Sequence, residues 1–294
     1  MNDMPELPEV ETIVRGLRAR ILGFVIEGVR VRSPHLLRDT SAADLRALRG
    51  NAVRRIRRRG KLILIDCEGG WTIVIHLKMT GQFLFRPISA RPDKHTHAVF
   101  VFKNEPRRLL FRDVRKFGFM CLRRTDGLSR DPLLAALGPE PLKFSLSKLG
   151  AILAGRSARL KSLLLDQSAL AGIGNIYADE ILFESRLNPL RRAGDLNPAE
   201  VRRLWAAMRD VLRRAVRLGG STIRDFADCD GIEGEFQIEF KAYGRTDEPC
   251  PRCGRPIERL RLGRRSTHFC PRCQKAVRRG LTRSPTLPRL EGGA

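Results

Sequence analysis

Residues 61–79 read KLILIDCEGGWTIVIHLKM, two short runs of strand-forming residues on either side of a glycine pair. Apolar and β-branched residues fill both runs, and the central Gly-Gly is typical of a tight hairpin turn. Two more runs of this kind follow, HAVFVFKN (97–104) and RLLFRDV (108–114). Helical stretches are scarce between about residues 24 and 125. This favours an antiparallel sandwich or barrel over a sheet built from βαβ units.

One helix is expected ahead of these strands. The chain begins MNDMPELPEV, in which Pro8 suits the first helical position. Apolar residues then recur at helical spacing from Val10 to Ile21. A helix start explains the sequence from Pro8 onward, but it does not explain Pro5 or Glu6.

The second half of the chain has a different pattern. LGPEPL (137–142) is a proline-rich connector that indicates a domain boundary, and residues 145–218 then have helical periodicity. In the clearest helix, Asn197 is the expected N-cap and Glu200 completes a capping box. Its expected buried stripe consists of Val201, Leu204, Trp205, Met208, Leu212 and Ala215. We therefore expect a helical domain after the strands.

Four of the seven cysteines form two CxxC pairs separated by sixteen residues, Cys250-Pro-Arg-Cys253 and Cys270-Pro-Arg-Cys273. Such pairs can present four thiolates to one zinc ion on a β-hairpin. Because four thiolates fill the coordination shell, this zinc would be structural. The alternatives are a redox pair or a chance pattern. Several arginines between the pairs would let the hairpin grip a DNA backbone.

The chain is strongly basic, with 56 Lys and Arg against 32 acids and a net charge of +24. A surplus of this size indicates a polyanionic partner such as a nucleic acid. A ribosome-associated protein, a membrane-surface binder and a codon bias toward arginine remain alternatives. The aromatic content of 6% disfavours a single-strand stacking platform. No apolar stretch is long enough for a membrane span and no secretory signal precedes Pro8, so we expect a cytoplasmic protein with no membrane partner.

Two further motifs carry possible phosphate contacts. In AGIGNIY (171–177), the glycines allow a sharp turn and close backbone approach. Asn175 then caps a helix whose free amide groups could bind a phosphate, although an ordinary glycine turn between two helices explains the motif equally well. The run from Arg57 to Lys61 enters a strand. A phosphate contact by Lys61 and a solvated basic surface both fit that run.

Residues at the start of the chain could themselves take part in a reaction. If Pro5 is the first residue, its nitrogen is a secondary amine with an ordinary pKa of about 8, so part of it is neutral and nucleophilic at pH 7. Such an amine can attack the anomeric carbon of a nucleoside and form a Schiff base, with Glu6 placed to move protons. The alternative is that Pro5 is only a stiff entry to the helix. Because residues 1–4 would make Pro5 an amide, we expect the functional start to be Met4, or the preceding residues to be removed.

Together these features resemble the formamidopyrimidine-DNA glycosylases, bacterial base-excision-repair enzymes that excise oxidised purines. The resemblance covers residues 4–275, and its motifs occur in the family's order. They are PELPEVET (5–12), RRRGKLILI (57–65), IHLKMTG (75–81), GIGNIYADE (172–180), YGR (243–245) and the paired CxxC motifs.

The resemblance implies an α+β protein in four parts. Residues 5–136 would form a catalytic antiparallel β-sandwich with flanking helices, and residues 137–246 a DNA-binding helical domain with a helix–two-turn–helix motif. Residues 247–275 would form a zinc-finger β-hairpin. Beyond the resemblance, the basic composition of the last residues predicts a disordered tail at 276–294. Double-stranded DNA would lie in the cleft between the domains. One structural zinc would be the only cofactor, and we expect a monomer associated with the bacterial nucleoid.

The resemblance also assigns site residues. Pro5 would be the nucleophile and Glu6 the acid/base residue beside it. Lys61, Asn175 and Arg265 would bind the phosphates around a flipped nucleotide. Lys61 and Arg265 would also count among the catalytic residues. Further DNA contacts would come from His97 and Lys161. Met79, Arg115 and Phe117 would fill the hole that the flipped base leaves in the stack. The zinc ligands would be Cys250, Cys253, Cys270 and Cys273.

The expected lesions follow from the same comparison. The start PELPE and the segment DVRKFG (113–118) resemble the purine-specific enzymes, although Val114 and Lys116 replace a Pro and an Arg of the family's usual segment. Residues 228–237 lie where those enzymes cover the flipped base, and this segment departs from the usual pattern. We expect excision of 8-oxoguanine and formamidopyrimidines, followed by β,δ-elimination. An enzyme for oxidised pyrimidines, a non-catalytic lesion-binding protein that retains residues 1–3, and an RNA- or ribosome-associated zinc-ribbon protein are the alternatives.

Overall fold

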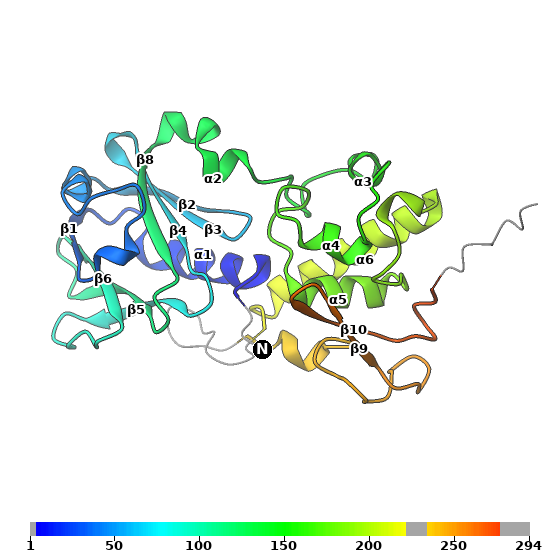
Figure 1. The fold of residues 1–294 in the computed structure, drawn as a ribbon. Helices are drawn as coiled ribbons and strands as arrows, with labels where there is room; N and C mark the ends of the chain where they lie inside the picture. The colour runs from blue at the N-terminus through cyan, green and yellow to red at the C-terminus, as the bar shows by residue number, and fades with distance from the viewer. Residues whose placement is uncertain (1–3, 222–233, 277–294) are drawn as a thin grey trace, which may run out of the picture.

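The computed structural model describes residues 4–221 and 234–276. It has a lobe of strands and a lobe of helices, and a small β-hairpin packs beside the helices (Figure 1). The expectations for residues 1–3, for most of the 228–237 segment and for the C-terminal tail lie outside the described residues.

The strands form two four-stranded antiparallel sheets, as the sequence predicts. The first has the order β1-β6-β7-β5, made of β1 (Ile26–Val31), β6 (Thr96–Phe102), β7 (Arg107–Asp113) and β5 (Gly81–Pro87). The second has the order β2-β3-β4-β8, made of β2 (Val53–Arg59), β3 (Leu62–Cys67), β4 (Trp71–His76) and β8 (Phe119–Arg124). The predicted hairpin at 61–79 is β3–β4, and both glycines of its turn have positive φ angles, 70° and 73°.

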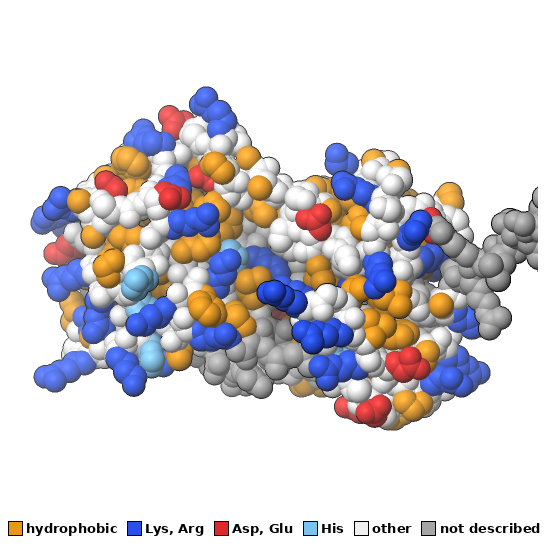
Figure 2. Space-filling model, in the orientation of Figure 1, with side chains coloured by type: hydrophobic (Ala, Val, Ile, Leu, Met, Phe, Trp, Pro, Cys, Tyr) orange, Lys and Arg blue, Asp and Glu red, His pale blue; other side chains and the backbone are white. Residues whose placement is uncertain are grey.

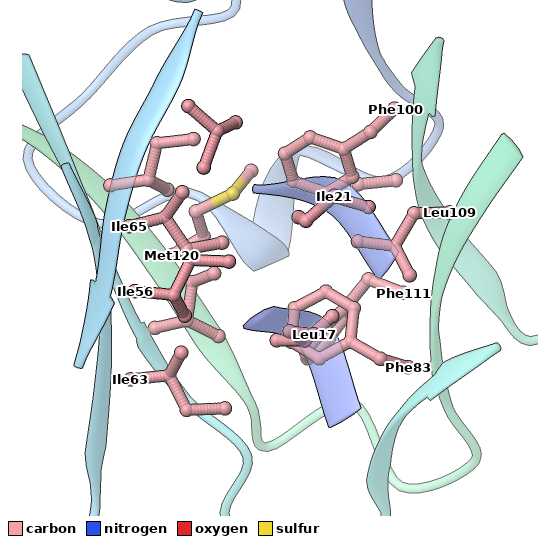
Figure 3. Packing of buried hydrophobic residues seen from close by; sticks show 14 of the residues in the cluster. Leu17, Ile21, Ile56, Ile63, Ile65, Phe83, Phe100, Leu109, Phe111 and Met120 are labelled. Carbon is pink, nitrogen blue, oxygen red and sulfur yellow. The ribbon is translucent and has the colours of Figure 1, made fainter. Parts of the chain in front are cut away.

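Helix α1 (Leu7–Ile21) packs its apolar face between the two sheets and completes the sandwich core. Figure 3 shows Leu17 and Ile21 of α1 between the inward side chains of the two sheets. These side chains are Ile56, Ile63, Ile65 and Met120 from one sheet, and Phe83, Phe100, Leu109 and Phe111 from the other. The alternate residues of β3 face a second apolar cluster instead, so every residue of that strand is buried.

The second lobe is helical, with α3 (Leu146–Leu153), α4 (Leu160–Leu165), α5 (Asn175–Glu184) and α6 (Pro198–Arg217), and a short α2 (Pro132–Ala135) precedes the connector. The predicted capping box of α6 is present, because the Asn197 side chain accepts from the Glu200 amide at 3.0 Å. Short 3₁₀ turns lie at Pro34–Leu36, Asp44–Leu48, Glu68–Gly70, Thr125–Arg130, Ala193–Asp195 and Phe236–Glu239. No helix among the described residues combines the length and the apolar character that crossing a membrane needs.

Helix α1 also joins the lobes, because Leu7 packs in the helical core while the rest of its buried face packs in the sandwich. The connector at 137–142 is held by the end of β2. Arg58 forms a buried ion pair with Glu140 at 2.7 Å, and Glu140 also accepts from the Gly60 amide at 2.6 Å. Arg59 donates to the carbonyls of residues 137 and 138. These two arginines therefore fix the connector next to Lys61.

The hairpin after the helical lobe consists of β9 (Glu258–Leu262) and β10 (Arg265–Phe269). Strand β10 packs against α5, and the hairpin base shares a small core with Phe183 of that helix. Helix α5 is consequently buried by α4, α6 and β10, which makes it the element that positions the site described next.

Candidate active site

Pro5 and Glu6 are buried where the two lobes meet. The Glu6 carboxylate accepts hydrogen bonds from the amides of Gly174 at 2.6 Å and Ile176 at 3.0 Å, in the first turn of α5. Two donors and the positive end of the helix dipole stabilise a carboxylate at this place. Because Glu6 occupies these amides, the structure contradicts the phosphate-binding interpretation of the motif and supports the alternative, a glycine turn between two helices. The predicted N-cap was also wrong, because Gly174 is the N-cap and Asn175 is the first helical residue.

The two glycines of the GIG motif are required by this contact. A Cβ on Gly174 would lie 2.3 Å from the Glu6 Cδ atom, and one on Gly172, whose φ is +98°, would lie 2.9 Å from the Leu7 Cβ atom. The expected close backbone approach is thus present, and the group that approaches is the start of the protein's own chain. A sequence motif that looked like a ligand loop serves here to hold Glu6.

Three charged groups act on one another at this place. Burial raises the pKa of Glu6 to about 7, with a further rise from Glu9 and an opposing effect from Lys61. Burial lowers the pKa of Lys61, which Glu6 opposes and Arg265 reinforces. Residues from α1, the β2–β3 turn and β10 therefore form one electrostatic cluster. A carboxyl group with a pKa near 7 can both donate and accept a proton at neutral pH.

Glu9 clamps the segment that carries Pro5 and Glu6. One of its carboxylate oxygens accepts from the Glu6 amide at 2.9 Å. The other accepts from the Tyr177 hydroxyl at 2.5 Å and from the Ser221 amide at 2.7 Å. Burial also raises the pKa of Tyr177 well above its ordinary value, so the hydroxyl stays a neutral donor. Local sequence patterns could not reveal this role of Glu9, because its partners lie 168 and 212 positions away.

Lys161 has no exposed surface, which argues against a direct contact with DNA; its part in DNA binding stays a prediction. Its ammonium group donates to the Asp179 carboxylate at 2.6 Å and to the Ser266 carbonyl at 2.7 Å. The second Asp179 oxygen accepts from the His268 amide at 3.0 Å. This buried pair fastens α4 and α5 to β10 directly after Arg265, so Lys161 acts on the site through the hairpin.

Arg265 itself is exposed at the start of β10. Next to it, the Ser266 hydroxyl lies 3.4 Å from the Asn175 amide nitrogen, and Asn175 Oδ1 has no partner among the described residues. Because a hydroxyl can donate as well as accept, turning the Asn175 amide over would pair its oxygen with Ser266 and direct its NH₂ group outward. Arg265 and Asn175 thus lie on adjoining elements, where both could donate to an anion.

The expected wedge residues lie on two loops of the sandwich that hydrogen-bond to each other. The Asp113 carboxylate accepts from the Thr80 hydroxyl, beside half-buried Met79, and from the Gly118 amide at 2.7 Å. Phe117 is 51% exposed, and the Arg115 guanidinium stacks 4.8 Å from its ring centroid.

His97 is buried beneath this pair of loops. Its Nε2 atom hydrogen-bonds the Asp113 carbonyl at 2.7 Å, so the ring supports the loop that carries Arg115 and Phe117. The two departures from the family's usual segment fall on exposed positions, Val114 and Lys116.

The four cysteines of the hairpin come together as predicted, with all four Sγ atoms within 4.8 Å of one another. The Cys250–Cys273 and Cys253–Cys270 sulfur pairs are 3.9 Å and 3.5 Å apart. A tetrahedral zinc with Zn–S distances of about 2.3 Å needs sulfurs about 3.8 Å apart, so the geometry fits one zinc. The site is closed by four thiolates, and its role is structural.

Charge surrounds the junction of the lobes. Figure 2 shows Lys and Arg side chains on both lobes around the hollow between them. Together with the exposed Arg265 and Phe117, this gives the junction a cationic rim and an apolar wedge.

Comparisons with known proteins agree with this geometry. Residues 4–120 match the model of the formamidopyrimidine-DNA glycosylase N-terminal domain. Residues 137–227 match that of the H2TH domain of the same enzymes, and residues 247–276 match the zinc finger found in FPG and IleRS.

Whole-chain relatives point the same way. Formamidopyrimidine-DNA glycosylases of Desulfitobacterium hafniense and Heliobacterium modesticaldum are 45% and 46% identical, over 92% of this chain and 100% of theirs. The solved complex of Lactococcus lactis Fpg with abasic-site DNA has a TM-score of 0.86 at 34% identity, covering 92% of this chain and 100% of that one. The MutM (FPG) protein of Thermus thermophilus has a TM-score of 0.82 at 45% identity, covering 92% and 98%. By its sequence, its fold and its zinc finger, this chain belongs to the formamidopyrimidine-DNA glycosylase family.

Proposed function

We propose that this protein excises oxidised purines from duplex DNA and then cleaves the strand at the resulting abasic site. Its relatives are named formamidopyrimidine-DNA glycosylases, and the Lactococcus lactis protein has been solved with DNA containing a Fapy-dG lesion or an abasic site. One observation in this chain carries the proposal: the Glu6 carboxylate, next to Pro5, is buried on the N-terminus of α5 beside Lys61.

The proposed chemistry starts at Pro5. Its nitrogen, as a free secondary amine, attacks C1′ of the damaged nucleotide. The base leaves with its bonding electrons and takes up the proton that the nitrogen loses. Glu6 donates a proton to the sugar ring oxygen as the ring opens, giving an iminium ion on Pro5. The iminium accepts the electrons released when a C2′ proton is removed, so the 3′ phosphate leaves, and the 5′ phosphate leaves in a second elimination. A one-nucleotide gap with a phosphate at each end remains.

The other residues would hold the DNA in place for this reaction. Lys61, Asn175 and Arg265 would bind the phosphates next to the flipped nucleotide. Met79, Arg115 and Phe117 would enter the stack that the base has left. Because all these groups come from one chain, we propose that the protein acts as a monomer on DNA in the bacterial cytoplasm.

The mechanism requires that nothing precedes Pro5 in the mature chain. We propose that Met4 is the functional start and is removed, and the family model of the N-terminal domain matches from residue 4.

Lesion preference can be tested with two labelled duplexes under single-turnover conditions. We expect faster cleavage of a duplex with 8-oxoguanine opposite cytosine than of one with thymine glycol. The reverse order would favour an enzyme for oxidised pyrimidines. Tight binding of an abasic duplex without any cleavage would instead identify a non-catalytic lesion-binding protein.

The rate of cleavage should depend on pH through two groups. Pro5 must be deprotonated, with an ordinary amine pKa of about 8, and Glu6 must be protonated, with a pKa raised to about 7. The rate should therefore rise with pH, peak between about 7 and 8, and then fall as Glu6 ionises. The Glu6→Gln variant should cleave more slowly at every pH. Its rate should rise with pH and then stay level above about pH 8. A falling limb that persists in this variant would assign it to another group.

Gly174→Ala should damage the site more than the fold, because the new Cβ would lie 2.3 Å from the Glu6 Cδ atom. A displacement of about 1 Å at a reacting group costs on the order of 100-fold in rate. Single-turnover cleavage and the melting temperature would be measured together. Gly150→Ala in α3 is the matched control, because a Cβ there meets nothing within 4 Å. Cleavage by Gly174→Ala at the wild-type rate would contradict the assigned position of Glu6.

Lys161→Met should weaken lesion-duplex binding by way of Arg265, because the lost ammonium group holds the Ser266 carbonyl. We expect Lys161→Met and Arg265→Ala each to lower affinity about tenfold, and the double variant to be no weaker than the worse single variant. Affinity would be measured over a range of salt, with zinc content as the check on folding. The opposite result would be additive losses of affinity in the double variant, with the slope of log affinity against log salt falling by about one unit for each substitution. That result would show that Lys161 contacts a phosphate itself.

A further inference from the structure

A second concave surface lies on the outer face of the β1-β6-β7-β5 sheet. It has a volume of about 790 Å³ and is lined by residues of β1, β6 and β7, of the loop after β5, and by Arg32 and Arg49, which follow β1 and the Asp44–Leu48 turn. None of these residues belongs to the site at the junction of the lobes. Its size is within the range of about 300–1,000 Å³ that is common for ligand-binding pockets.

The rim of this pocket is cationic. Arg30, Arg32, Arg49 and Arg108 line it, against the single acid Glu27. Arg30 and Arg49 are exposed, and no ion pair neutralises either of them within residues 4–221 and 234–276. Arg108 donates to a loop carbonyl, but its Nε atom is buried without a partner in the same ranges. The guanidinium groups of this rim can donate charge-assisted hydrogen bonds to the carboxylates or phosphates of a ligand.

The floor of the pocket is apolar. Val99 and Val101 of β6 form it, and Ile88, which is 55% exposed, stands at the side with Pro92. A Cβ on Gly28 would meet nothing within 4 Å, so the pocket is open above β1. A duplex backbone presents phosphates on a broad, convex surface and has no apolar group to fill such a floor. A peptide that combines acidic residues with an apolar side chain complements both the rim and the floor.

The place of the pocket in the sheet also favours a peptide. Strand β1 is the outer strand of its sheet among the named strands of the described chain. The start of its outer edge is already occupied, because Ile26 exchanges backbone hydrogen bonds with Gly50 and Asn51 and the Asp44–Leu48 turn packs beside the strand. An extended peptide would therefore lie along the later residues of this edge, beside Arg30, and direct alternate side chains to the outer face. We propose that this arginine-rimmed pocket docks an acidic segment of a partner protein, with one apolar side chain on the Val99–Val101 floor.

The test uses fluorescence anisotropy with three labelled eight-residue peptides. One is rich in Asp and Glu with a central Phe, one has Ser in place of Phe, and one is rich in Lys with the Phe kept. We expect the first peptide to bind with a micromolar Kd, and loss of the Phe to weaken binding about tenfold. The Lys-rich peptide should not bind.

Two variants of the full chain locate the binding. The double variant Arg30→Glu/Arg49→Glu reverses the charge of the rim. Its affinity for the acidic Phe peptide should be lower by at least about tenfold. Gly28→Leu fills the open space and should remove the advantage of the Phe over the Ser peptide. The matched control is Arg202→Glu with Arg213→Glu, exposed positions of α6 that give the same change of net charge. This control should bind the peptide within about twofold of wild type.

Three results would overturn the proposal. The first is no acidic peptide binding tighter than about 1 mM. The second is an equal loss in the rim and control pairs, which would show attraction to net charge alone. The third is a lower affinity for the lesion duplex, with a smaller salt dependence, in the rim variant but not in the control variant. That result would identify this face as a DNA contact.

Discussion

Strand cleavage should fall on the order of 10³-fold or more when one non-removable residue precedes Pro5. A chain that starts Met-Lys-Pro5 keeps its methionine, because the bulky lysine blocks removal. The Pro5 nitrogen is then an amide, whose lone pair is delocalised into the peptide bond and cannot attack a sugar. Single-turnover cleavage of an 8-oxoguanine duplex measures the loss against a chain that starts at Pro5.

Binding separates lost chemistry from a lost site in this extended chain. Lys61 and Arg265 are unchanged by the added residue, so the extended chain should keep most of the affinity for a duplex with a stable abasic analogue. It should also keep its zinc and its melting temperature. An extended chain that cleaves at the wild-type rate would remove Pro5 from the mechanism, while its family membership and its fold would stand.

Cys253→Ser should abolish zinc binding and lower duplex affinity at least about 100-fold. The hairpin buries only a small cluster around Cys250 and Ile257, too little apolar area to fold unaided. Structural zinc contributes about 10–16 kcal/mol of apparent binding energy to such units, and the loss of one thiolate removes most of it. Without the metal, β10 would lose its contacts with Lys161 and Asp179, and Arg265 would no longer be held in place. Metal analysis and duplex titration measure the two effects.

Cys67→Ser provides the matched control. Cys67 is buried in the sandwich core, far along the chain from the hairpin, and is a free thiol. This variant should keep one zinc per chain and wild-type duplex affinity, with only a lower melting temperature from the buried hydroxyl. A zinc-free Cys253→Ser protein that bound duplex as tightly as wild type would show that the hairpin does not contribute to DNA binding.

Local patterns predicted much of the fold. The β3–β4 hairpin depends on neighbouring residues and a Gly-Gly turn, and the α6 cap on Asn197 and Glu200, so both could be read from short segments. The four zinc ligands could be predicted because their spacing is set by the metal. The choice of a sandwich over a barrel and the bounds of the parts came from the family resemblance, since periodicity alone left a barrel open.

The buried polar contacts could not be predicted, because their partners are distant in the chain. Glu9 accepts from groups far along the sequence, and Lys161 is paired to Asp179 and to a backbone carbonyl of β10. The DNA contact of Lys161 was assigned from the family resemblance, which says nothing of the burial of its side chain. The GIG motif was misread for the same reason: the anion that occupies the amides of α5 is Glu6, 168 residues before Gly174.

The most direct test is to find the atom that bonds to the sugar. Borohydride added during cleavage of an 8-oxoguanine duplex reduces the imine, and digestion followed by mass spectrometry locates the adduct. We predict a single modified peptide that begins at Pro5, with the sugar remnant on the proline nitrogen. A remnant on a lysine, or a trapped active chain that still carries residues ahead of Pro5, would contradict this mechanism.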